Sequence, residues 1–346
     1  PEGEVIFMVS KPEEVAAAAS DQAALAEGVF FARDLVNAPA NVLTTDDFAA
    51  RLAAMQELGL EIEILQEHEL KDLGMRLLLS VGQGSDTPTK MVVMRWNGGD
   101  ADAAPLALVG KGVVFDTGGI SLKPTNPMHA LMKMDMSGAG AVLAAMTALR
   151  DLGCRNHVTA WLMCTDNMPS GSAMKLGDVL EIRNGKTVEI HNTDAEGRLI
   201  LADGLSLAAE EEPDAIVDIA TLTGAAMSAL GQEMAAVIGT HDALIAQVEA
   251  SSAAVDEPVW QLPLARDRYR KLLDSVVADM KNVGGPYAGA TTAAIFLSEF
   301  VGDVPWAHLD IAGPMNVDSD SGWKSRGATG FGARLLVDLA MEFSPA

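Results

Sequence analysis

The sequence predicts an α/β protein, with a central, mostly parallel β-sheet flanked by helices and preceded by a linker helix. Three observations lead to this fold class. Short β-rich runs alternate with Ala- and Leu-rich helical stretches along nearly the whole chain. The 346 residues are 49% hydrophobic, which is enough for a substantial core and excludes a disordered chain. No internal repeat and no low-complexity linker divides the sequence.

The first 36 residues contain a strand-like run, residues 5–9, and a long Ala-rich helix, residues 13–35. A single strand and a single helix cannot form a hydrophobic core. We therefore expect residues 1–36 to be a linker strand and helix, the remnant of an absent N-terminal domain. Residues 37–346 are expected to form the domain that carries the functional site.

Local signals predict the elements that follow. Thr44 and Asp47 resemble a capping box, which would begin a helix that Gly59 ends. A β-hairpin is expected over residues 179–191, because Asn184-Gly185 supplies the positive φ angles of a two-residue turn. The strands expected in the main sheet are residues 91–96, 106–109, 158–165 and 215–221, and the helices expected to cover it are residues 137–152, 199–211 and 291–301.

The charge and the cysteine content exclude several classes of protein. Asp and Glu number 48 against 24 Lys and Arg, so the net charge is −24 and the surface would repel nucleic acids and anionic membranes. We therefore expect no membrane association and no nucleic-acid partner. No apolar run reaches the roughly 18 residues of a membrane span. The two cysteines, Cys154 and Cys164, cannot staple a fold of this size, so we expect a reducing compartment and a cytoplasmic protein.

Glycine and charge concentrate at the ends of predicted strands in two segments, residues 110–123 and 192–199, where α/β folds place their ligand sites. Neither is a nucleotide-binding loop, because the G-x-G-x-x-G and G-x-x-x-x-G-K-[ST] patterns are absent. The Gly138 and Gly140 pair is better explained by close helix packing. The sequence also lacks the G-x-S-x-G elbow and the H-E-x-x-H zinc motif, and His191 is expected to be solvated rather than a ligand.

Four carboxylates remain as candidates for the chemistry: Asp116 and Asp135 in apolar surroundings, and Asp194 and Glu196 in the second glycine-rich segment. Asp194 and Glu196 alone would be an ordinary acidic start of a helix. Carboxylates brought together without a cation repel each other strongly, whereas two divalent ions convert that repulsion into binding. The four acids together therefore indicate a dinuclear metal-dependent hydrolase.

The motifs around these acids resemble the leucyl aminopeptidase family, the dinuclear metallo-exopeptidases of the M17 type. The most specific motif is NTDAEGRL at residues 192–199. The match continues, in order and at near-family spacing, through RDLVNAPAN (33–41), VGKGVVFDTGGISLK (109–123), MDMSGAGAV (134–142), IATLTGA (219–225) and WAHLDIAG (306–313). The resemblance therefore implies that residues 37–346 are a catalytic metallopeptidase domain.

The resemblance also implies which residues hold the metals. Lys111, Asp116 and Asp135 are similar to the ligands of the tighter metal site. Asp116, Asp194 and Glu196 are similar to the ligands of the more exchangeable one, with Asp116 and Glu196 reaching both ions. The implied cofactors are two divalent ions per subunit, with Zn²⁺ and Mn²⁺ as the first candidates. A lysine ligand must be neutral, which two adjacent dications would favour by lowering its pKa.

Two further residues, Lys123 and Arg198, are similar to the catalytic residues of the family that are not metal ligands. In the family a metal-activated water attacks the peptide carbonyl. Lys123 would polarise that carbonyl, and Arg198 is similar to the residue that holds a bicarbonate acting as a proton shuttle. The free amine of the substrate is expected on a metal and on Asp135, which would make the enzyme an exopeptidase.

A pocket for the first side chain of the peptide is implied in the same way. Its residues are expected to be Met132, Thr221, Gly224, Ala312 and Met315. Methionine is flexible and apolar, so peptides with N-terminal Leu or Met are the expected substrates. The implied assembly is a homo-hexamer, a dimer of trimers.

The sequence departs from the family pattern in two places, and two other functions remain open. Lys123 and Asp135 stand twelve positions apart, one more than in the family, and the loop with Pro124 and Pro127 is expected to absorb the extra residue. Residues 286–289 are less glycine-rich than in relatives, so the rim of the cleft is expected to differ. The alternatives are a dinuclear phosphoesterase and a DNA-binding accessory protein, which the charge of −24 disfavours.

Overall fold

A sheet of eight strands forms the centre of the computed structural model, which describes residues 6–99 and 103–345. In spatial order the strands are β1 (Glu61–Leu65), β2 (Lys90–Trp96), β4 (His157–Asn167), β3 (Pro105–Asp116), β7 (Ala215–Ala220), β11 (Trp306–Asp310), β8 (Ala235–Gly239) and β9 (Val259–Gln261). The four strands expected from the sequence are present as β2, β3, β4 and β7. The prediction of an α/β fold is therefore confirmed.

The centre of the sheet is parallel. Strands β4, β3, β7 and β11 run in one direction, and β8 also pairs in parallel with β9. The pairings of β1 with β2, β2 with β4, and β8 with β11 are antiparallel. Parallel neighbours need crossover connections, which explains why helices separate the central strands in the sequence.

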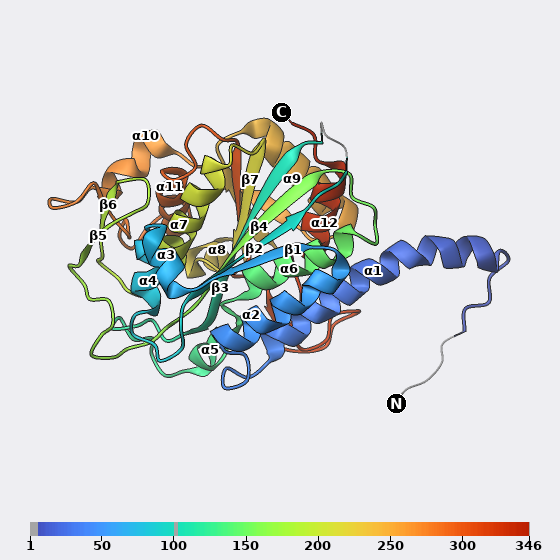
Figure 1. Cartoon of the computed structure of the whole chain (residues 1–346), viewed down its shortest axis with the longest axis horizontal. Coiled ribbons are helices and arrows are strands. Elements are labelled where there is room, and N and C mark those ends of the chain that lie inside the picture. Colours follow the sequence, from blue (N-terminus) through green and yellow to red (C-terminus); the bar gives the residue numbers. More distant parts are fainter. Residues whose placement is uncertain (1–5, 100–102, 346) are drawn as a thin grey trace.

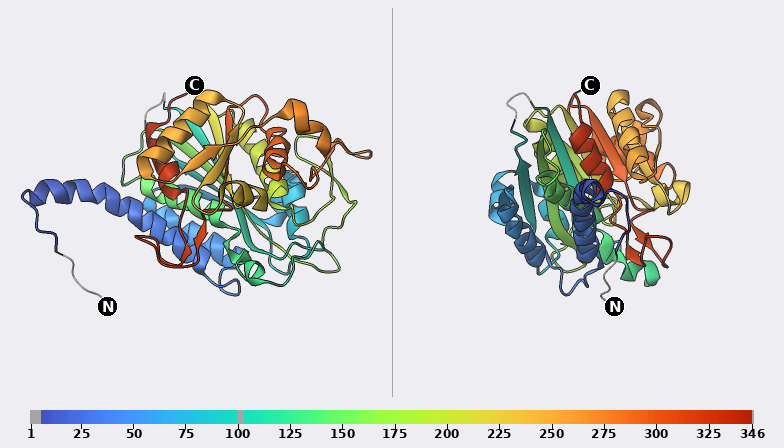
Figure 2. Two further views of the ribbon diagram at one scale, coloured as in Figure 1. Left: turned by 180° about the vertical axis from the view of Figure 1, so that it is seen from behind. Right: turned by 90° about the vertical axis from the view of Figure 1, so that its right-hand side faces the viewer.

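Helices cover both faces of the sheet, each over its own apolar core (Figure 2). One face carries α1 (Pro12–Asn37), α2 (Thr45–Ala53), α6 (Ser137–Leu149), α9 (Asp242–Val255) and α12 (Ala333–Glu342). The other face carries α3 (Glu67–Asp72), α4 (Arg76–Gly82), α7 (Gly197–Glu210), α8 (Gly224–Leu230) and α11 (Gly289–Ser298). The helices expected over residues 137–152, 199–211 and 291–301 correspond to α6, α7 and α11.

The long helix α1 confirms the helix expected over residues 13–35, and only its second half joins the core. Val29, Ala32 and Leu35 are buried there, where α1 packs on α6. The first half is exposed and projects away from the body of the molecule (Figure 1). The strand expected at residues 5–9 is wrong for residues 6–9, which form none, and residue 5 lies outside the described part. Ile6, Phe7 and Met8 are exposed and have no neighbouring strand to pair with.

Strand β3 is longer than the expected run of residues 106–109, because it continues to Asp116. The Gly110-Lys111-Gly112 segment, expected at the end of a strand, therefore lies inside a strand. A Cβ at Gly110 would meet the backbone of Ala139 on α6 at 2.8 Å, so glycine is required by close packing of the helix. Glycine inside a strand here marks the close approach of a helix rather than the end of the strand.

Two local predictions hold in outline. Thr44 is the N-cap of α2, and its hydroxyl accepts a hydrogen bond from the N–H of Asp47 at 3.2 Å. The helix continues as a 3₁₀ turn, η1 (Ala54–Leu58), and this helical segment ends at Gly59, as expected.

The hairpin is present as β5 (Val179–Glu181) and β6 (Thr187–Glu189), but its two-residue turn is wrong. Ile182 donates to the carbonyl of Lys186, which encloses a three-residue loop, and Gly185 alone of that loop has a positive φ.

The remaining elements are short and lie around the main sheet. Strand β10 (Met280–Lys281) joins β6 and β5 in a three-stranded sheet, and β12 (Asn316–Val317) pairs with β13 (Gly327–Ala328). Short helical turns are α5 (Pro127–Ala130), η2 (Met132–Met134), α10 (Arg266–Tyr269) and η3 (Arg270–Leu273). Both cysteines are buried and unpaired. Among the described residues, no helix is both long and apolar enough to cross a bilayer.

Candidate active site

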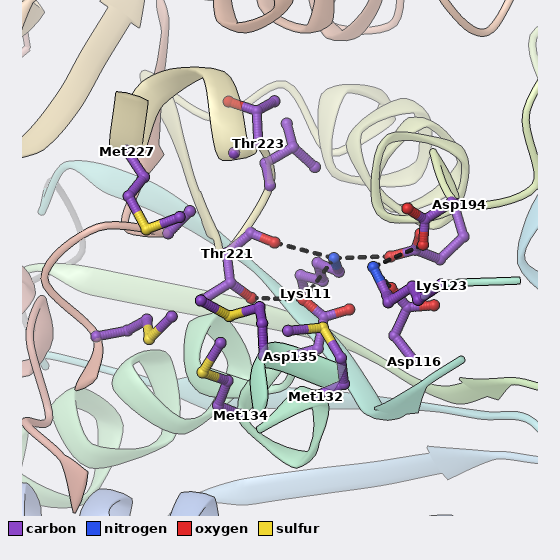
Figure 3. A pocket seen from close by; sticks show the side chains of 16 residues that line it. Lys111, Asp116, Lys123, Met132, Met134, Asp135, Asp194, Thr221, Thr223 and Met227 are labelled. Carbon is purple, nitrogen blue, oxygen red and sulfur yellow. Dashed lines mark hydrogen bonds and ion pairs between the residues drawn. The ribbon is translucent and has the colours of Figure 1, made fainter. Parts of the chain in front are cut away.

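A cavity of about 290 Å³ opens near the carboxyl ends of β3 and β7. Its charged lining residues are Lys111, Asp116, Lys123, Asp135, Asp194 and Glu196. Figure 3 shows Asp116, Lys123 and Asp194 on one side of this cavity and Met227 on the other. The structure therefore brings together all five predicted metal ligands and one of the two predicted catalytic residues.

These residues lie close together because the N-terminal ends of two helices, α6 and α7, pack closely on the sheet. Asp135 stands two residues before the start of α6, whose Gly138 lies so near β7 that a Cβ would meet the carbonyl oxygen of Ile219 at 2.1 Å. The packing role expected for Gly138 is thus confirmed. Gly197 begins α7, and a Cβ there would meet Nζ of Lys111 at 2.7 Å. Absence of a side chain at these two glycines lets the acidic residues reach the strand.

The deeper part of the cavity is organised around Lys111. Its Nζ lies 2.8 Å from Oδ1 of Asp135, 2.7 Å from Oε1 of Glu196 and 3.0 Å from the carbonyl oxygen of Thr221. The hydroxyl of Thr221 also donates to Oδ1 of Asp135 at 2.8 Å. The Lys111, Asp135 and Glu196 side chains are at most 6% exposed.

The outer part is organised around Lys123. Its Nζ lies 2.8 Å from Oδ2 of Asp116 and 2.6 Å from Oδ1 of Asp194. Asp116 is held from behind by Asn167, whose amide donates to Oδ1 at 2.9 Å, and by the N–H of Gly118 at 2.8 Å. Lys123 is 19% exposed and therefore stands nearer to solvent than Lys111.

The protonation of these groups follows from burial and from their neighbours. Burial lowers the pKa of Lys111, but the Asp135, Glu196 and Asp116 carboxylates outweigh it and raise that pKa above its ordinary value. Burial raises the pKa of Asp135. Burial, then the Asp116 charge, raises the pKa of Asp194 to about 6, although Lys123 opposes the shift. Four carboxylates facing two lysines leave an excess of negative charge, so the cavity favours cations.

The donor set suits divalent ions. Asp116, Asp194 and Glu196 each offer an oxygen, and these oxygens lie within 4.8 Å of one another. Oδ2 of Asp135 is buried and has no hydrogen-bond partner among the described residues, which leaves it free to bind a cation. Carboxylate oxygens with one lysine nitrogen are hard and borderline ligands, appropriate for Mn²⁺, Mg²⁺ or Zn²⁺.

Arg198, the second predicted catalytic residue, lies behind the cavity and is not among its lining residues. It is 7% exposed, and its Nη1 donates to the carbonyl oxygen of Asn282 at 2.9 Å. Its Nε is buried and has no partner among the described residues. Burial lowers the pKa of Arg198 to about 10, so the side chain stays cationic and keeps a free donor.

The five predicted pocket residues all line the apolar part of the same cavity. The sequence reasoning missed five others that line it with them: Met128, Met134, Leu222, Thr223 and Met227. Three of these are methionines, so thioethers form much of the wall. Met128 stands four positions before Met132 and Met134 two positions after it, a clustering that could have pointed to Met128 and Met134.

Two residues that support the site were also missed. Asn167 ends β4 beside the end of β3, and its amide donates to Asp116 and to the carbonyl of Thr193. Asp310 ends β11, and its carboxylate accepts from the N–H groups of Leu222 and Thr223 and from the Thr223 hydroxyl. A polar residue at the carboxyl end of a buried strand was the available signal for both.

His191 is solvated, as expected. Its side chain is 43% exposed and its Nε2 lies 3.0 Å from Oε1 of Glu189, on the small sheet. It is not a lining residue of the cavity.

Comparison with known proteins agrees with this geometry. Residues 30–337 match the model of the cytosol aminopeptidase family, catalytic domain. The chain is 52% identical over 343 residues to a probable cytosol aminopeptidase of Cereibacter sphaeroides, covering 97% of this chain and 70% of that protein. It is 51% identical over 342 residues to a probable cytosol aminopeptidase of Dinoroseobacter shibae, covering 98% of this chain and 70% of that protein.

A solved structure gives the same result for the fold. The bottromycin maturation enzyme BotP, in complex with Mn, superimposes with a TM-score of 0.91 at 42% identity, covering 96% of this chain and 73% of that one. The family match spans most of the sequence, and both curated relatives are named probable cytosol aminopeptidase. The chain belongs to the cytosol aminopeptidase family and contains its catalytic domain, so it is a metallo-aminopeptidase.

Proposed function

We propose that this aminopeptidase removes apolar N-terminal residues, with Leu and Met preferred, from peptides by means of two divalent ions. The observation that carries the proposal is one cavity that combines four carboxylates, two lysines and a wall of methionines. The charged side would hold the metals and the peptide backbone, and the thioether side would hold the first side chain.

The residues that would hold the two ions form two sets, which share Asp116. Lys111, Asp116 and Asp135 would supply the ligands of one site, and Asp116, Asp194 and Glu196 those of the other. Bound there, the ions would act as Lewis acids and lower the pKa of water enough to make a nucleophile at neutral pH. Mn²⁺ is favoured by the Mn complex of BotP, and Zn²⁺ remains the second candidate.

Lys123 would act on the peptide carbonyl. In the structure its ammonium is shared between Asp116 and Asp194. Cations on these carboxylates would neutralise them, which frees Lys123 to donate to the carbonyl oxygen as negative charge develops there. Burial lowers the pKa of Lys123, but the unneutralised Asp116 and Asp194 carboxylates outweigh it and raise the pKa above its ordinary value.

Proton transfer would depend on Arg198. Its unpartnered Nε and its buried positive charge are suited to a small anion, and bicarbonate is the anion we propose. A bicarbonate held there could pass a proton between the attacking water and the leaving amine.

The methionine wall sets the proposed specificity. Met132 and Met315 are buried and Met128 is 38% exposed, so the wall extends from the floor toward the mouth of the cavity. Flexible thioethers adapt to several apolar side chains, whereas an acidic side chain would meet the excess negative charge. We expect kcat/KM for Leu-amide to exceed that for Asp-amide by at least about tenfold. Equal values would show that this wall does not bind the first side chain.

The assembly and compartment are also proposed. We infer a homo-hexamer, a dimer of trimers, acting in the cytoplasm, on the strength of the family resemblance and of the names of the relatives. Light scattering on the purified protein tests the assembly, and a stable monomer would contradict it.

Recognition of the free amine distinguishes an aminopeptidase from other hydrolases. We expect Leu-p-nitroanilide to be hydrolysed and N-acetyl-Leu-p-nitroanilide to be left intact, because acetylation removes the lone pair that would bind a metal. Release of nitroaniline is followed by absorbance in the presence of Mn²⁺. Comparable rates on the two substrates would refute the exopeptidase assignment.

A further inference from the structure

The loop that carries Asp194 and Glu196, here called the metal loop, has no regular structure of its own before α7 begins at Gly197, and Arg198 follows in the first turn of that helix. Ser121 and Asn167 bond to Thr193 of this loop, and another distant residue, Asn282, is bonded to it on both sides of Asp194. Asn282 follows β10, is fully buried, and stands about 90 positions away in the sequence. It belongs neither to the predicted ligands nor to the residues that line the cavity.

The carboxamide of Asn282 holds the backbone on both sides of Asp194. Its Oδ1 accepts from the N–H of His191 at 2.9 Å and from the N–H of Asn192 at 3.3 Å. Its Nδ2 donates to the carbonyl oxygen of Asn192 at 2.7 Å and to that of Ala195 at 3.4 Å. One side chain thus fixes the residues that precede Asp194 and the residue between Asp194 and Glu196.

The backbone of Asn282 acts on the third functional residue. Its carbonyl oxygen accepts from Nη1 of Arg198 at 2.9 Å, which fixes the direction of the guanidinium. The same residue therefore bonds to the metal loop through its side chain and to Arg198 through its main chain.

Asn282 is itself held in place by the small sheet. Strand β10 pairs in parallel with β6, and the N–H of Asn282 donates to the carbonyl of Glu189 at 3.1 Å. At the other end of β10, Asp279 accepts from the N–H and the hydroxyl of Thr187 at 2.8 and 2.7 Å. The small sheet therefore places an amide at the metal loop without contributing to the cavity wall.

We infer that Asn282 is a positioning residue of the metal centre, which sets the spacing of Asp194 and Glu196 and the direction of Arg198. This inference rests on the proposed function. Only an amide of this length provides an acceptor for two N–H groups together with donors for two carbonyls. Aspartate has no donors, and alanine has neither donors nor acceptors, so either substitution would release the loop in part or in full.

The test compares Asn282→Ala with Asp279→Ala, a matched control at the opposite end of β10, whose side chain bonds to Thr187 of β6 and not to the metal loop. Mn²⁺ affinity is measured by competition with a chelating dye, and kinetics on Leu-p-nitroanilide are measured at saturating Mn²⁺. For Asn282→Ala we expect Mn²⁺ affinity to fall by about 10- to 100-fold, as is usual when an outer partner of metal ligands is lost. At saturating Mn²⁺ we expect kcat to stay at least about fivefold low while KM changes by less than about threefold, since the spacing of Asp194 and Glu196 is no longer fixed.

For Asp279→Ala we expect Mn²⁺ affinity and kcat within about twofold of wild type, because only the attachment of β10 is weakened. Asn282→Asp keeps the shape and the acceptor and provides a folded variant if Asn282→Ala unfolds. We expect its Mn²⁺ affinity to lie between those of wild type and Asn282→Ala. Wild-type Mn²⁺ affinity in both Asn282 variants would overturn the inference, and so would an equal loss in Asp279→Ala. A wild-type protein that binds no Mn²⁺ would instead refute the proposed function.

Discussion

Two sets of buried carboxylates in this protein have different kinds of partners. In the cavity, Asp135 and Glu196 are bound by the ammonium of Lys111. Elsewhere, Glu257 accepts from the N–H groups of Gly332 and Leu335 at the start of α12, and also from Nε of Arg334 at 3.3 Å. Nothing in the residue type alone distinguishes these acids in the sequence.

The kind of partner indicates whether a buried carboxylate serves function or stability. A backbone N–H is fixed by the fold, so the carboxylate that it binds is satisfied permanently and contributes to the folded state. A lysine ammonium on a flexible side chain can move away when a metal arrives. Asp203, which accepts from the N–H of Leu78 at 2.9 Å, belongs with Glu257 to the structural set. We expect substitutions in the cavity to change turnover and metal content, and substitutions in the structural set to change stability.

The largest effect on turnover is expected for the cavity carboxylates. Asp194→Ala and Glu196→Ala each remove a proposed ligand, so kcat should fall by about three orders of magnitude or more, together with metal content. The melting temperature without metal should change little, because these loop acids do not serve the core. Elemental analysis measures the metal content, and thermal unfolding measures the melting temperature. Full turnover in either variant would remove the basis of the two-metal proposal.

A smaller loss is expected for Lys123→Ala. If Lys123 stabilises charge on the carbonyl oxygen, its removal should reduce kcat by roughly two orders of magnitude or more. Metal content should stay near that of wild type, since Lys123 is not a proposed ligand. Loss of the metals along with turnover would show that Lys123 organises Asp116 and Asp194 rather than acting on the substrate.

How far the sequence could predict this arrangement depends on the kind of signal. The central strands were predictable because they are continuous apolar runs, and the site acids because they lie in specific motifs. The full extent of β3 was not, because Gly110 and Gly112 interrupt the apolar run, and the close approach of α6 to Gly110 and of β4 to Gly112 is seen only in the structure. Asn282 gave no signal either, because its bonds to the metal loop depend on the pairing of β10 with β6.

The smallest effect is expected in the structural set. Burial raises the pKa of Asp203 to about 7, although N–H groups, first that of Leu78, oppose the shift. The unfolded chain releases this proton near pH 4, so the raised pKa stabilises the folded state fully below pH 4 and this contribution is lost as the pH rises toward 7. Asp203→Asn should remove that pH dependence and leave kcat unchanged. Urea unfolding of both proteins from pH 4.5 to 7.5 measures it, and parallel curves would contradict the assignment.

The most direct test of the two-metal account is a titration of the metal-free protein with Mn²⁺, with bound metal and hydrolysis of Leu-p-nitroanilide measured on the same samples. We expect no turnover in the metal-free protein, binding that saturates at two ions per chain, and turnover that follows occupancy of the second site. Full turnover in the presence of a strong chelator, or saturation at one ion with full activity, would contradict the account.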